Sequence, residues 1–578
     1  MTRMKKSTKI LLAILVVAAV LRIGGLIHHE PFIHDHDEKS FIETALRFGK
    51  LDLRPFTFSH AYFFYTILFL EYALFFIIQK IFISGFTPNV FIVEYLRNPD
   101  AFIYMARVTV FLFGMGVVYL TYKIAGNLFG KRTALLSGFI SACTLGLVQL
   151  SCIVKADIPA AFFLLLSVFL ATEAVKTCSR RFLFAAFFVL GIAAATKFHI
   201  VLGVPFLIAA TFLYFKEGRG TIKILMIGFA FLILGLILGC PFIVIKPLAV
   251  FNDTVIRLGK EYMVDKTMSF PAVFHIKHHL RNLLGIPLEA LGIAGILYAF
   301  FRHKKEDVMI LSFVAAFFFV FFNSIGFAFH LLPVIPFIII LGSRLLEQTV
   351  FYVAKGKPRQ NLLLGMLAFV FVYPSLVDSV KYNIYLNAAD TRVKFEKWAE
   401  KNIKPGADIL VEGVISDTDA STVCDLKPNL KSLQNDLKTI KEKGGSGFLI
   451  EKEISLLEAS GNTQGRYCIE KTGFLSKNLI KESRPEYILV NGLNDADYGE
   501  MDYYFPSDYK EKREDTKEYV RKWYRPVKRF TPTTKTIIFP SIFLNSDYEA
   551  LRHISFRNAL NIVKGWELTL YRRGRQSK

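Results

Sequence analysis

The chain has 578 residues, of which 53% are hydrophobic, and its mean hydropathy is +0.40. Globular domains are about 45–50% apolar, and the excess here lies in long Leu, Ile and Phe runs before residue 380, which excludes a purely soluble protein and indicates a polytopic membrane region. The formal net charge is +22. Its Lys and Arg residues cluster in short loops between apolar segments, as orientation signals do, which argues against a nucleic-acid partner.

The first apolar segment, residues 10–27, is long enough to cross a bilayer at about 1.5 Å per residue. The basic residues before it predict a cytoplasmic N-terminus: Arg3, Lys5, Lys6 and Lys9. Its weak cleavage pattern and the many later spans argue against a removed signal peptide. The acidic cluster His34-Asp35-His36-Asp37-Glu38 comes directly after this segment, so we expect it at the far surface of the membrane, where charged groups indicate a functional site.

Basic linkers between the later apolar segments predict the topology. They lie at residues 130–132, 176–181, 216–223, 302–305 and 355–359. If all five linkers are cytoplasmic, successive spans cross the membrane in alternate directions. About eleven spans then place the C-terminal part on the far side of the membrane. The predicted spans are residues 10–27, 104–125, 133–152, 158–175, 182–196, 200–215, 221–240, 284–301, 308–324, 331–348 and 362–378.

The apolar segment at residues 60–84 does not fit this alternation, because counting it as a span would place the basic linkers on the wrong side. It contains Glu71, Gln79 and Lys80 and is rich in aromatic residues, so we predict a helix that lies in the outer membrane interface. The first far-side loop then extends from about 28 to 103, and loops of this length are usually functional. A second far-side loop covers about 241–283.

Residues 380–578 have the composition of a soluble domain. Residues 391–403 predict an amphipathic helix that ends at Lys404-Pro405-Gly406, and 408–411 and 487–490 are short strand candidates. We therefore predict a polytopic α-helical membrane domain at 1–379, followed by an extracytoplasmic α/β domain at 380–578. Cys424 and Cys468 lie in the second domain, and we expect them to form a disulfide if it faces an oxidising compartment.

Ionisable residues recur at the outer ends of the predicted spans. They are Arg22, Arg107, Lys155, Asp157, Lys197, His199 and His330, and the predicted topology brings all of them to the level of Asp37. Isolated charges in a bilayer cost several kcal/mol, so these groups should face inward or pair. One interpretation is a set of interface anchors and internal ion pairs. The other is a reaction site at the membrane surface, where cations hold an anionic lipid head group and carboxylates handle a proton or a metal.

The acidic cluster also suggests a divalent metal, either Mg, Mn or Zn. The side chains of Asp35, His36 and Asp37 have suitable ligand atoms. Because consecutive residues cannot all face one ion, at most two or three would take part. The alternative is a solvated loop with one working carboxylate.

Several of these motifs resemble a known family. Asp37-Glu38 after the first span resembles the acidic pair of the protein O-mannosyltransferases and the aminoarabinose lipid A transferases, which are integral-membrane glycosyltransferases of the GT-C class. The resemblance extends over most of residues 1–400. Its other elements are Ala106-Arg107, Asn127-Leu128-Phe129-Gly130, Lys155-Ala156-Asp157, Gly191 to Lys197, and His330-Leu331-Leu332-Pro333.

The chain also departs from the family pattern. Phe329-His330 stands where the family often has Arg-Tyr, and the His-Pro-Pro signature of the first loop is absent. The tryptophan-rich motif of oligosaccharyltransferases is also missing. These differences concern the donor and the acceptor more than the reaction class.

The resemblance implies a GT-C fold and a polyprenyl-phosphate sugar donor, from which the sugar is transferred with inversion to a hydroxyl of a glycan, lipid or protein at the outer face. It implies Asp37 as general base, with Glu38 orienting the acceptor or sharing a metal, and Asp157 as a second acidic residue. Arg22, Lys155 and Lys197 would neutralise the leaving phosphate, in a donor site that also includes Arg107, His199 and His330.

Two other functional classes remain open. A transporter or flippase would also be polytopic, but we find neither the internal repeats nor the broken helices typical of many transporters. An assembly partner of cell-envelope glycan synthesis would need no base. Substituting Asp37 would be harmless in an assembly partner, which distinguishes it from a glycosyltransferase.

Overall fold

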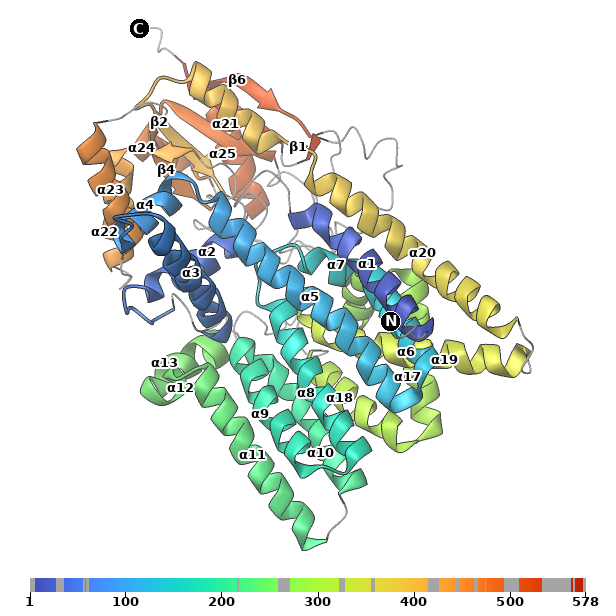
Figure 1. Cartoon of the computed structure of the whole chain (residues 1–578). Coiled ribbons are helices and arrows are strands. Elements are labelled where there is room, and N and C mark those ends of the chain that lie inside the picture. Colours follow the sequence, from blue (N-terminus) through green and yellow to red (C-terminus); the bar gives the residue numbers. More distant parts are fainter. Residues whose placement is uncertain are drawn as a thin grey trace.

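The computed structural model describes residues 6–26, 36–55, 58, 62–215, 218–257, 271–321, 328–354, 359–413, 426–442, 447–461, 466–473, 475–492, 509–532, 563–564 and 567–574. A bundle of helices makes up the part before residue 387, and a smaller sheet domain lies at one end of it (Figure 1). This arrangement confirms the predicted fold class, a polytopic helical protein with an α/β region at its C-terminal end.

Within the described residues, seven helices are long and apolar enough to cross a membrane. A bent pair, Ala272–Leu284 and Ile286–Arg302, would form an eighth span if its two arms, which meet at 116°, are counted together. The chain is therefore a multi-pass integral membrane protein. The seven are α1 (Lys6–Leu26), α3 (Tyr62–Phe82), α5 (Asp100–Phe129), α8 (Asp157–Thr177), α11 (Arg219–Gly239), the segment Ala328–Ala354, which contains η4 (Ala328–Val334) and α19 (Ile335–Ala354), and α20 (Gln360–Leu386).

Other predicted spans form shorter helices, so the number eleven stays a prediction. They are α9 (Arg180–Thr196), η1 (Phe198–Gly203) with α10 (Val204–Tyr214), α17 (Ile286–Arg302) after the short helix α16 (Arg281–Leu284), and α18 (Lys305–Phe321). The α3 helix is also among the seven apolar helices above. Its predicted position in the membrane interface stays a prediction, as does the side on which each end of the bundle lies.

The predicted span at 133–152 stays a prediction, and the chain there forms two helices, α6 (Lys131–Cys143) and α7 (Leu145–Leu150), with a break at Thr144. Thr144 has extended backbone angles, φ −66° and ψ 121°. The backbone N–H of Leu145 then donates to the hydroxyl of Ser375 in α20 at 2.8 Å. This bond compensates for the helical bond lost at the break, as a buried backbone donor requires.

Helices α9 and α11 pack at very short range through glycines. A Cβ atom on Gly191 would lie 2.1 Å from the carbonyl oxygen of Leu232, and one on Gly235 would lie 2.1 Å from that of Phe188. Small residues at such crossings let two helix backbones approach closely within a membrane. The two helices are thereby fixed against each other along the segment that leads to Lys197.

The segment predicted as the first far-side loop contains α2 (His36–Phe48), α3 and α4 (Pro88–Arg97). Helices α2 and α3 pack through aromatic rings, with the ring of Phe41 5.2 Å from that of Phe64 and 5.0 Å from that of Tyr65. This segment also contacts the segment predicted as the second far-side loop, because the backbone N–H of Phe58 donates to Asp253 at 2.9 Å. The second turn of α2, which follows Asp37 and Glu38, is thus packed against α3.

Among the described residues of the sheet domain, the main sheet has six strands in the order β3-β4-β2-β5-β8-β6. Strands β3, β4, β2 and β5 are parallel, and β8 is antiparallel to both β5 and β6. The predicted strands at 408–411 and 487–490 are both confirmed. The strands are β3 (Lys427–Pro428), β4 (Arg466–Thr472), β2 (Asp408–Glu412), β5 (Tyr487–Asn491), β8 (Leu568–Arg573) and β6 (Tyr524–Phe530), while β1 (Ala389–Asp390) pairs separately with β7 (Val563–Lys564).

Alternate residues of the central strands reach opposite faces of the sheet, as the two-residue period of a strand requires. Ile409 and Val411 join the core under α21, whereas Leu410 joins the core under α24 and α25. The predicted helix at 391–403 is confirmed as α21. The helices of this domain are α21 (Thr391–Asn402), α22 (Leu430–Glu442), α23 (Phe448–Ser460), α24 (Lys477–Ser483) and α25 (Tyr509–Trp523).

Cys468 lies half-buried in β4 with a free thiol, in contrast to the predicted disulfide. Its predicted partner, Cys424, lies outside the described residues. Burial raises the pKa of the Cys468 thiol, and a hydrogen bond with Asp408 raises it further. Because the thiolate is the form that attacks a disulfide, this environment disfavours oxidation of Cys468.

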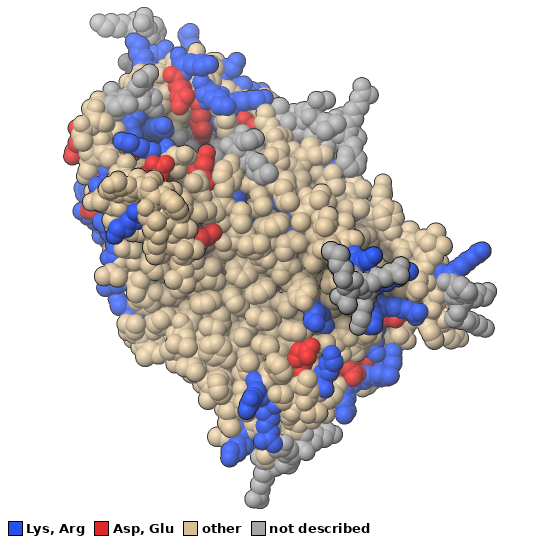
Figure 2. All heavy atoms as spheres, viewed as in Figure 1, with Lys and Arg blue, Asp and Glu red and all other residues tan. Residues whose placement is uncertain are grey.

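Charged residues are distributed unevenly over the surface. Figure 2 shows a broad face with few charges between the sheet domain and the opposite end of the bundle, where Lys and Arg gather again. Large apolar side chains are exposed on the bundle, as expected of helices that contact lipid. Examples are Leu112, Leu234, Met366 and Val370.

Candidate active site

Asp37 and Glu38 both lie in the first turn of α2, where carboxylates are favoured by the positive end of the helix dipole. Successive helical residues point about 100° apart because a turn takes 3.6 residues. The two carboxylates consequently face different surroundings, although they are neighbours in the sequence.

Glu38 forms a fully buried ion pair with Arg107 of α5. Arg107 donates from Nε to Oε1 at 3.0 Å and from Nη2 to Oε2 at 2.7 Å, and each side chain is only 1% exposed. Glu38 also accepts a bond from the backbone N–H of Val154 at 2.9 Å. This carboxylate therefore ties α2 to α5 and to the segment that carries Lys155, and its oxygens are occupied within the protein.

Asp37 pairs with Lys155 nearer the surface. The Lys155 ammonium lies 2.9 Å from Oδ2 of Asp37, and the two side chains are 4% and 15% exposed. Because Val154 is held by Glu38, the neighbouring Lys155 is held in position for this contact. Of the two acidic residues, Asp37 is the one with part of its side chain open to solvent.

A second lysine–aspartate pair lies next to the first. Asp157, the first residue of α8, accepts a bond from the ammonium of Lys197, which follows α9 in an extended conformation. Lys197 also interacts electrostatically with Lys155 and Asp37, so the two pairs are neighbours. Lys155, Asp157 and Lys197 thus pair inside the bundle, and their common level at the outer face stays a prediction.

The ring of Phe329 connects the two pairs. The ammonium of Lys155 lies 4.6 Å from the ring centroid and that of Lys197 lies 4.9 Å from it. A cation over an aromatic face gains about 0.5–2 kcal/mol, depending on how far it is desolvated. Sequence reasoning noted Phe329 only as a departure from the family pattern and missed this contact; its position directly before His330 was the available signal.

His199 and His330 complete the cluster on the buried side. Their ring centroids are 5.7 Å apart, and the His330 ring lies 4.5 Å from that of Phe329. His330 is also within electrostatic range of Lys155 and Lys197. The structure thus brings together Asp37, Lys155, Asp157, Lys197, His199 and His330, which come from α2, the segment between α7 and α8, the start of α8, the α9–η1 junction, η1 and η4.

Arg22 and Arg107 take different places from those expected of a donor-phosphate site. Arg22 is fully buried and donates to the carbonyl oxygens of Ala18 and Ala142 and to the hydroxyl of Ser151, at 3.0, 2.9 and 3.2 Å. It joins α1 to α6 and α7. The guanidinium of Arg107 is engaged by Glu38, as described above.

The predicted metal site involves residues that are only partly described. His34 and Asp35 lie outside the described residues, and of His36 only the backbone is described, as the first residue of α2. Among the described residues, no group of three or more His, Cys, Asp and Glu side chains could hold a metal ion. The ammonium beside Asp37 would also repel a divalent cation, so the described residues do not fit a metal, and the metal stays a prediction.

Residues 100–245 match the family model of the dolichyl-phosphate-mannose-protein mannosyltransferases. Over this segment the chain resembles those mannosyltransferases. The segment contains Arg107, Lys155, Asp157, Lys197 and His199, whereas Asp37 and Glu38 precede it. The match thus covers the elements that carry both lysines of the cluster.

Among curated proteins, YkcB of Bacillus subtilis (strain 168), which carries the name of a mannosyltransferase, is 37% identical over 86 residues. This alignment spans 15% of the chain and 12% of YkcB.

Two solved structures have a similar course of the chain. The apo structure of ArnT from Cupriavidus metallidurans has 14% identity and a TM-score of 0.48, with coverage of 73% of this chain and 85% of ArnT. The oligosaccharyltransferase AglB from Archaeoglobus fulgidus, in complex with an inhibitory peptide and a dolichol-phosphate, has 12% identity and a TM-score of 0.48, with coverage of 90% and 73%.

Proposed function

We propose that the protein transfers a sugar from a polyprenyl-phosphate-linked donor to a hydroxyl acceptor at the outer face of the membrane, with inversion. The acceptor is a glycan, a lipid or a protein. The observation that carries the proposal is the meeting of two lysine–aspartate pairs around Phe329 at the sheet-domain end of an apolar helix bundle. The match of residues 100–245 to mannosyltransferases that use dolichyl-phosphate mannose supports the donor class.

Asp37 is the general base in this proposal. The acceptor oxygen forms a bond to the anomeric carbon while the bond from that carbon to the phosphate oxygen breaks, and the bonding electron pair stays on the phosphate. The acceptor proton passes to the Asp37 carboxylate. A partly exposed carboxylate at the mouth of the cluster suits this step, because a base must lie within hydrogen-bond reach of the proton that it removes.

Lys155 and Lys197 stabilise the leaving phosphate. Charge develops on the phosphate oxygen as the sugar leaves, and preorganised cations in a water-poor site stabilise that charge more than they would in water. The aromatic ring of Phe329 leaves the ammonium protons available, since it contacts the cations without neutralising them. Asp157 holds Lys197 in place, as the second acidic residue of the site.

Glu38 and Arg107 are positioning residues in this proposal. They hold the start of α2 against α5, and through Val154 they hold the segment that carries Lys155. Neither needs to touch the substrate for the reaction to depend on it. The cluster faces the extracytoplasmic side, together with the sheet domain, in the plasma or inner membrane.

The test is release of free polyprenyl phosphate by the full-length protein in lipid, from a panel of polyprenyl-phosphate monosaccharides. We expect release by the wild type and none by Asp37→Asn. The matched control is Asp52→Asn, in the same loop, where Asp52 pairs with Arg47 at 2.7 Å outside the cluster. Full activity of Asp37→Asn would refute the role of Asp37, and movement of an intact donor across the bilayer without release would favour a flippase.

A further inference from the structure

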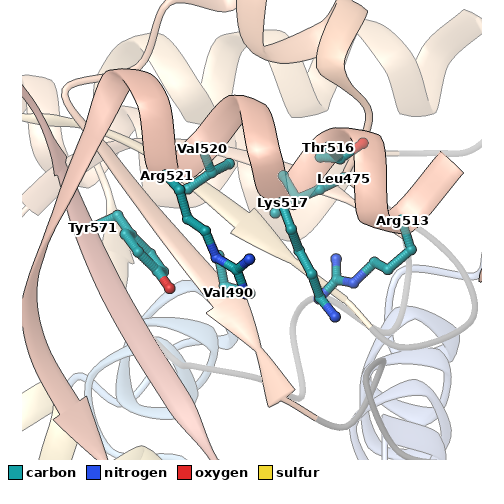
Figure 3. A pocket seen from close by; sticks show the side chains of 8 residues that line it. All are labelled: Leu475, Val490, Arg513, Thr516, Lys517, Val520, Arg521 and Tyr571. Carbon is teal, nitrogen blue, oxygen red and sulfur yellow. The ribbon is translucent and has the colours of Figure 1, made fainter.

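The sheet domain contains a small cavity between α25 and the neighbouring strands, with a volume of about 60 Å³ (Figure 3). Its apolar lining comes from Leu475, Val490 and Val520. The remaining lining residues are polar or cationic: Arg513, Thr516, Lys517, Arg521 and Tyr571. The cavity is large enough for a few water molecules or one small anionic group.

Three cations line this cavity from a single helix face. Arg513, Lys517 and Arg521 follow one another at intervals of four residues along α25. Figure 3 shows their side chains extending from the same side of the helix, toward the end of the strand that carries Val490. Like charges at this spacing destabilise a helix, and a bound anion would remove that cost.

Arg521 is the lining cation that no described carboxylate pairs. No Asp or Glu lines the cavity within the described part of the domain. Lys517 contacts Glu514 at 2.8 Å, but that carboxylate is 68% exposed, and such surface pairs contribute little. Arg521 is exposed and forms no ion pair with any described residue.

Arg513 is different, because it is buried and oriented by the sheet. It forms an ion pair with Glu412 and donates to the carbonyl oxygen of Asn491 at 3.3 Å. The Glu412 carboxylate also accepts bonds from the backbone N–H groups of Leu475 and Asn491, at 3.3 and 3.0 Å. The backbone at this edge therefore already presents converging donors to an anionic group.

The position in the sheet also favours a ligand site. Glu412 and Asn491 are the last residues of the adjacent parallel strands β2 and β5. After β2 the chain forms β3 and β4, which lie on one side of β2 in the sheet. It then crosses to the opposite side of β2 and forms β5. Open parallel sheets bind ligands at the carboxyl ends of their strands where the strand order reverses in this way.

We propose that this cavity binds a phosphate group. The Arg521 guanidinium matches the geometry of phosphate oxygens, the Lys517 ammonium adds a point charge, and the hydroxyl of Tyr571 adds a donor, while Arg513 stays paired with Glu412. Figure 3 shows the Tyr571 hydroxyl and the Arg521 guanidinium extending to the same region beside Val490. The site lies in the sheet domain and requires no sugar donor, so it is independent of the proposed transfer reaction.

The experiment measures binding of radiolabelled inorganic phosphate to the full-length protein in nanodiscs of zwitterionic lipid, at constant ionic strength. We expect saturable binding by the wild type and at least tenfold weaker binding by the double variant Lys517→Gln, Arg521→Gln. The matched control is Lys522→Gln on the same helix, because Lys522 lies over Trp523 and does not line the cavity. Lys522→Gln should bind as the wild type does.

Two further arms make the result decisive. Lys197→Met tests whether phosphate binds at the membrane cluster instead. If Lys197→Met loses phosphate binding while the double variant binds normally, the proposal is overturned. Equal binding by the wild type and the double variant would also overturn it. Competition by glycerol 1-phosphate alone would identify a soluble or glycan-borne phosphate, whereas competition by phosphatidylglycerol vesicles alone would identify a lipid head group. If the double variant melts at a lower temperature without phosphate, Arg521→Gln alone, at an exposed position, replaces it.

Discussion

The membrane cluster and the cavity of the sheet domain are built on the same element, a buried Glu–Arg pair that also accepts backbone N–H bonds. In the bundle, Glu38 pairs with Arg107 and holds Val154, while in the sheet domain Glu412 pairs with Arg513 and holds Asn491. What differs is the set of charges next to the pair. Beside Glu38 there are two aspartates and two lysines, whereas the cavity near Glu412 is lined by cations without a carboxylate.

This difference separates a site suited to reaction from one suited to binding. Proton transfer needs a base beside the group that loses the proton, so a mixed set of charges is useful in the bundle. Holding a phosphate needs cations only, so one sign of charge is sufficient in the sheet domain. The buried pair supplies rigidity in both places, and its own charges are used up in doing so.

The largest expected effect is on Asp37, the residue that sets the reactive site apart from the binding site. We expect Asp37→Asn to lower the turnover rate about 10²–10⁴-fold, the usual contribution of a general base, with little change in the melting temperature. Single-turnover kinetics with a polyprenyl-phosphate sugar, alongside a thermal melt, measures both. A turnover loss that is matched by a large fall in melting temperature would make Asp37 a structural residue instead.

Removal of one partner from either buried pair should test whether the two pairs are equivalent. Glu38→Ala and Glu412→Ala should each cost about 3–5 kcal/mol of stability, because each leaves a buried guanidinium without its partner. Thermal or denaturant unfolding of each variant gives the comparison. The control is Glu38→Met with Arg107→Met, which removes both charges and should restore much of the loss; equal destabilisation in the double variant would contradict the explanation.

Lys197→Met should produce a smaller loss of activity. Loss of one donor to a developing oxyanion lowers the rate about 10²–10³-fold in well-studied sites, and Lys155 remains to stabilise part of the charge, so we expect about 10²-fold or less. The measurement is kcat and KM for the donor. A change confined to KM would indicate ground-state binding alone, and Lys176→Met, in a linker outside the cluster, is the matched control.

The smallest expected effect concerns the surface pair at the cavity. Glu514→Gln removes the carboxylate that lies 2.8 Å from the Lys517 ammonium and should tighten phosphate binding a few-fold, because exposed ion pairs contribute about 0–1 kcal/mol. Phosphate titration of the nanodisc protein measures it. Weaker binding in this variant would show that Glu514 supports the site instead of competing with it.

Much of the architecture follows from patterns that are local in the sequence. The long apolar runs predicted helices such as α8 and α11, and the apolar strand candidates predicted β2 and β5. The break at Thr144 could not be predicted, because it depends on a hydroxyl 230 positions away in the chain. Hydropathy alone also does not distinguish one helix from two that continue each other.

The sequence indicated which residues belong to the candidate site in the bundle. It did not indicate which of them form ion pairs with one another. Asp37, Lys155 and Lys197 each follow the outer end of a predicted span, so the predicted topology places them at the same depth in the membrane. Apart from the family resemblance, no local pattern separates Asp37 from Glu38, since the distinction depends on Arg107, which is 69 positions from Glu38. Phe329 was missed because an aromatic residue in an apolar segment is indistinguishable from core packing until its neighbours are known.

The close crossing of α9 and α11 has a consequence for mutational scanning. Any side chain at Gly191 or Gly235 would collide with the backbone of the opposite helix, so both positions should tolerate almost no replacement. Gly191 and Lys197 are the two ends of one short segment. A mutational scan of that segment would therefore show a similar loss of activity on substitution at both ends. Only the lysine end has a chemical role in the proposed reaction. Sensitivity to substitution would thus point to a steric requirement as strongly as to a reactive group, and measuring protein abundance together with activity in the same scan would tell them apart.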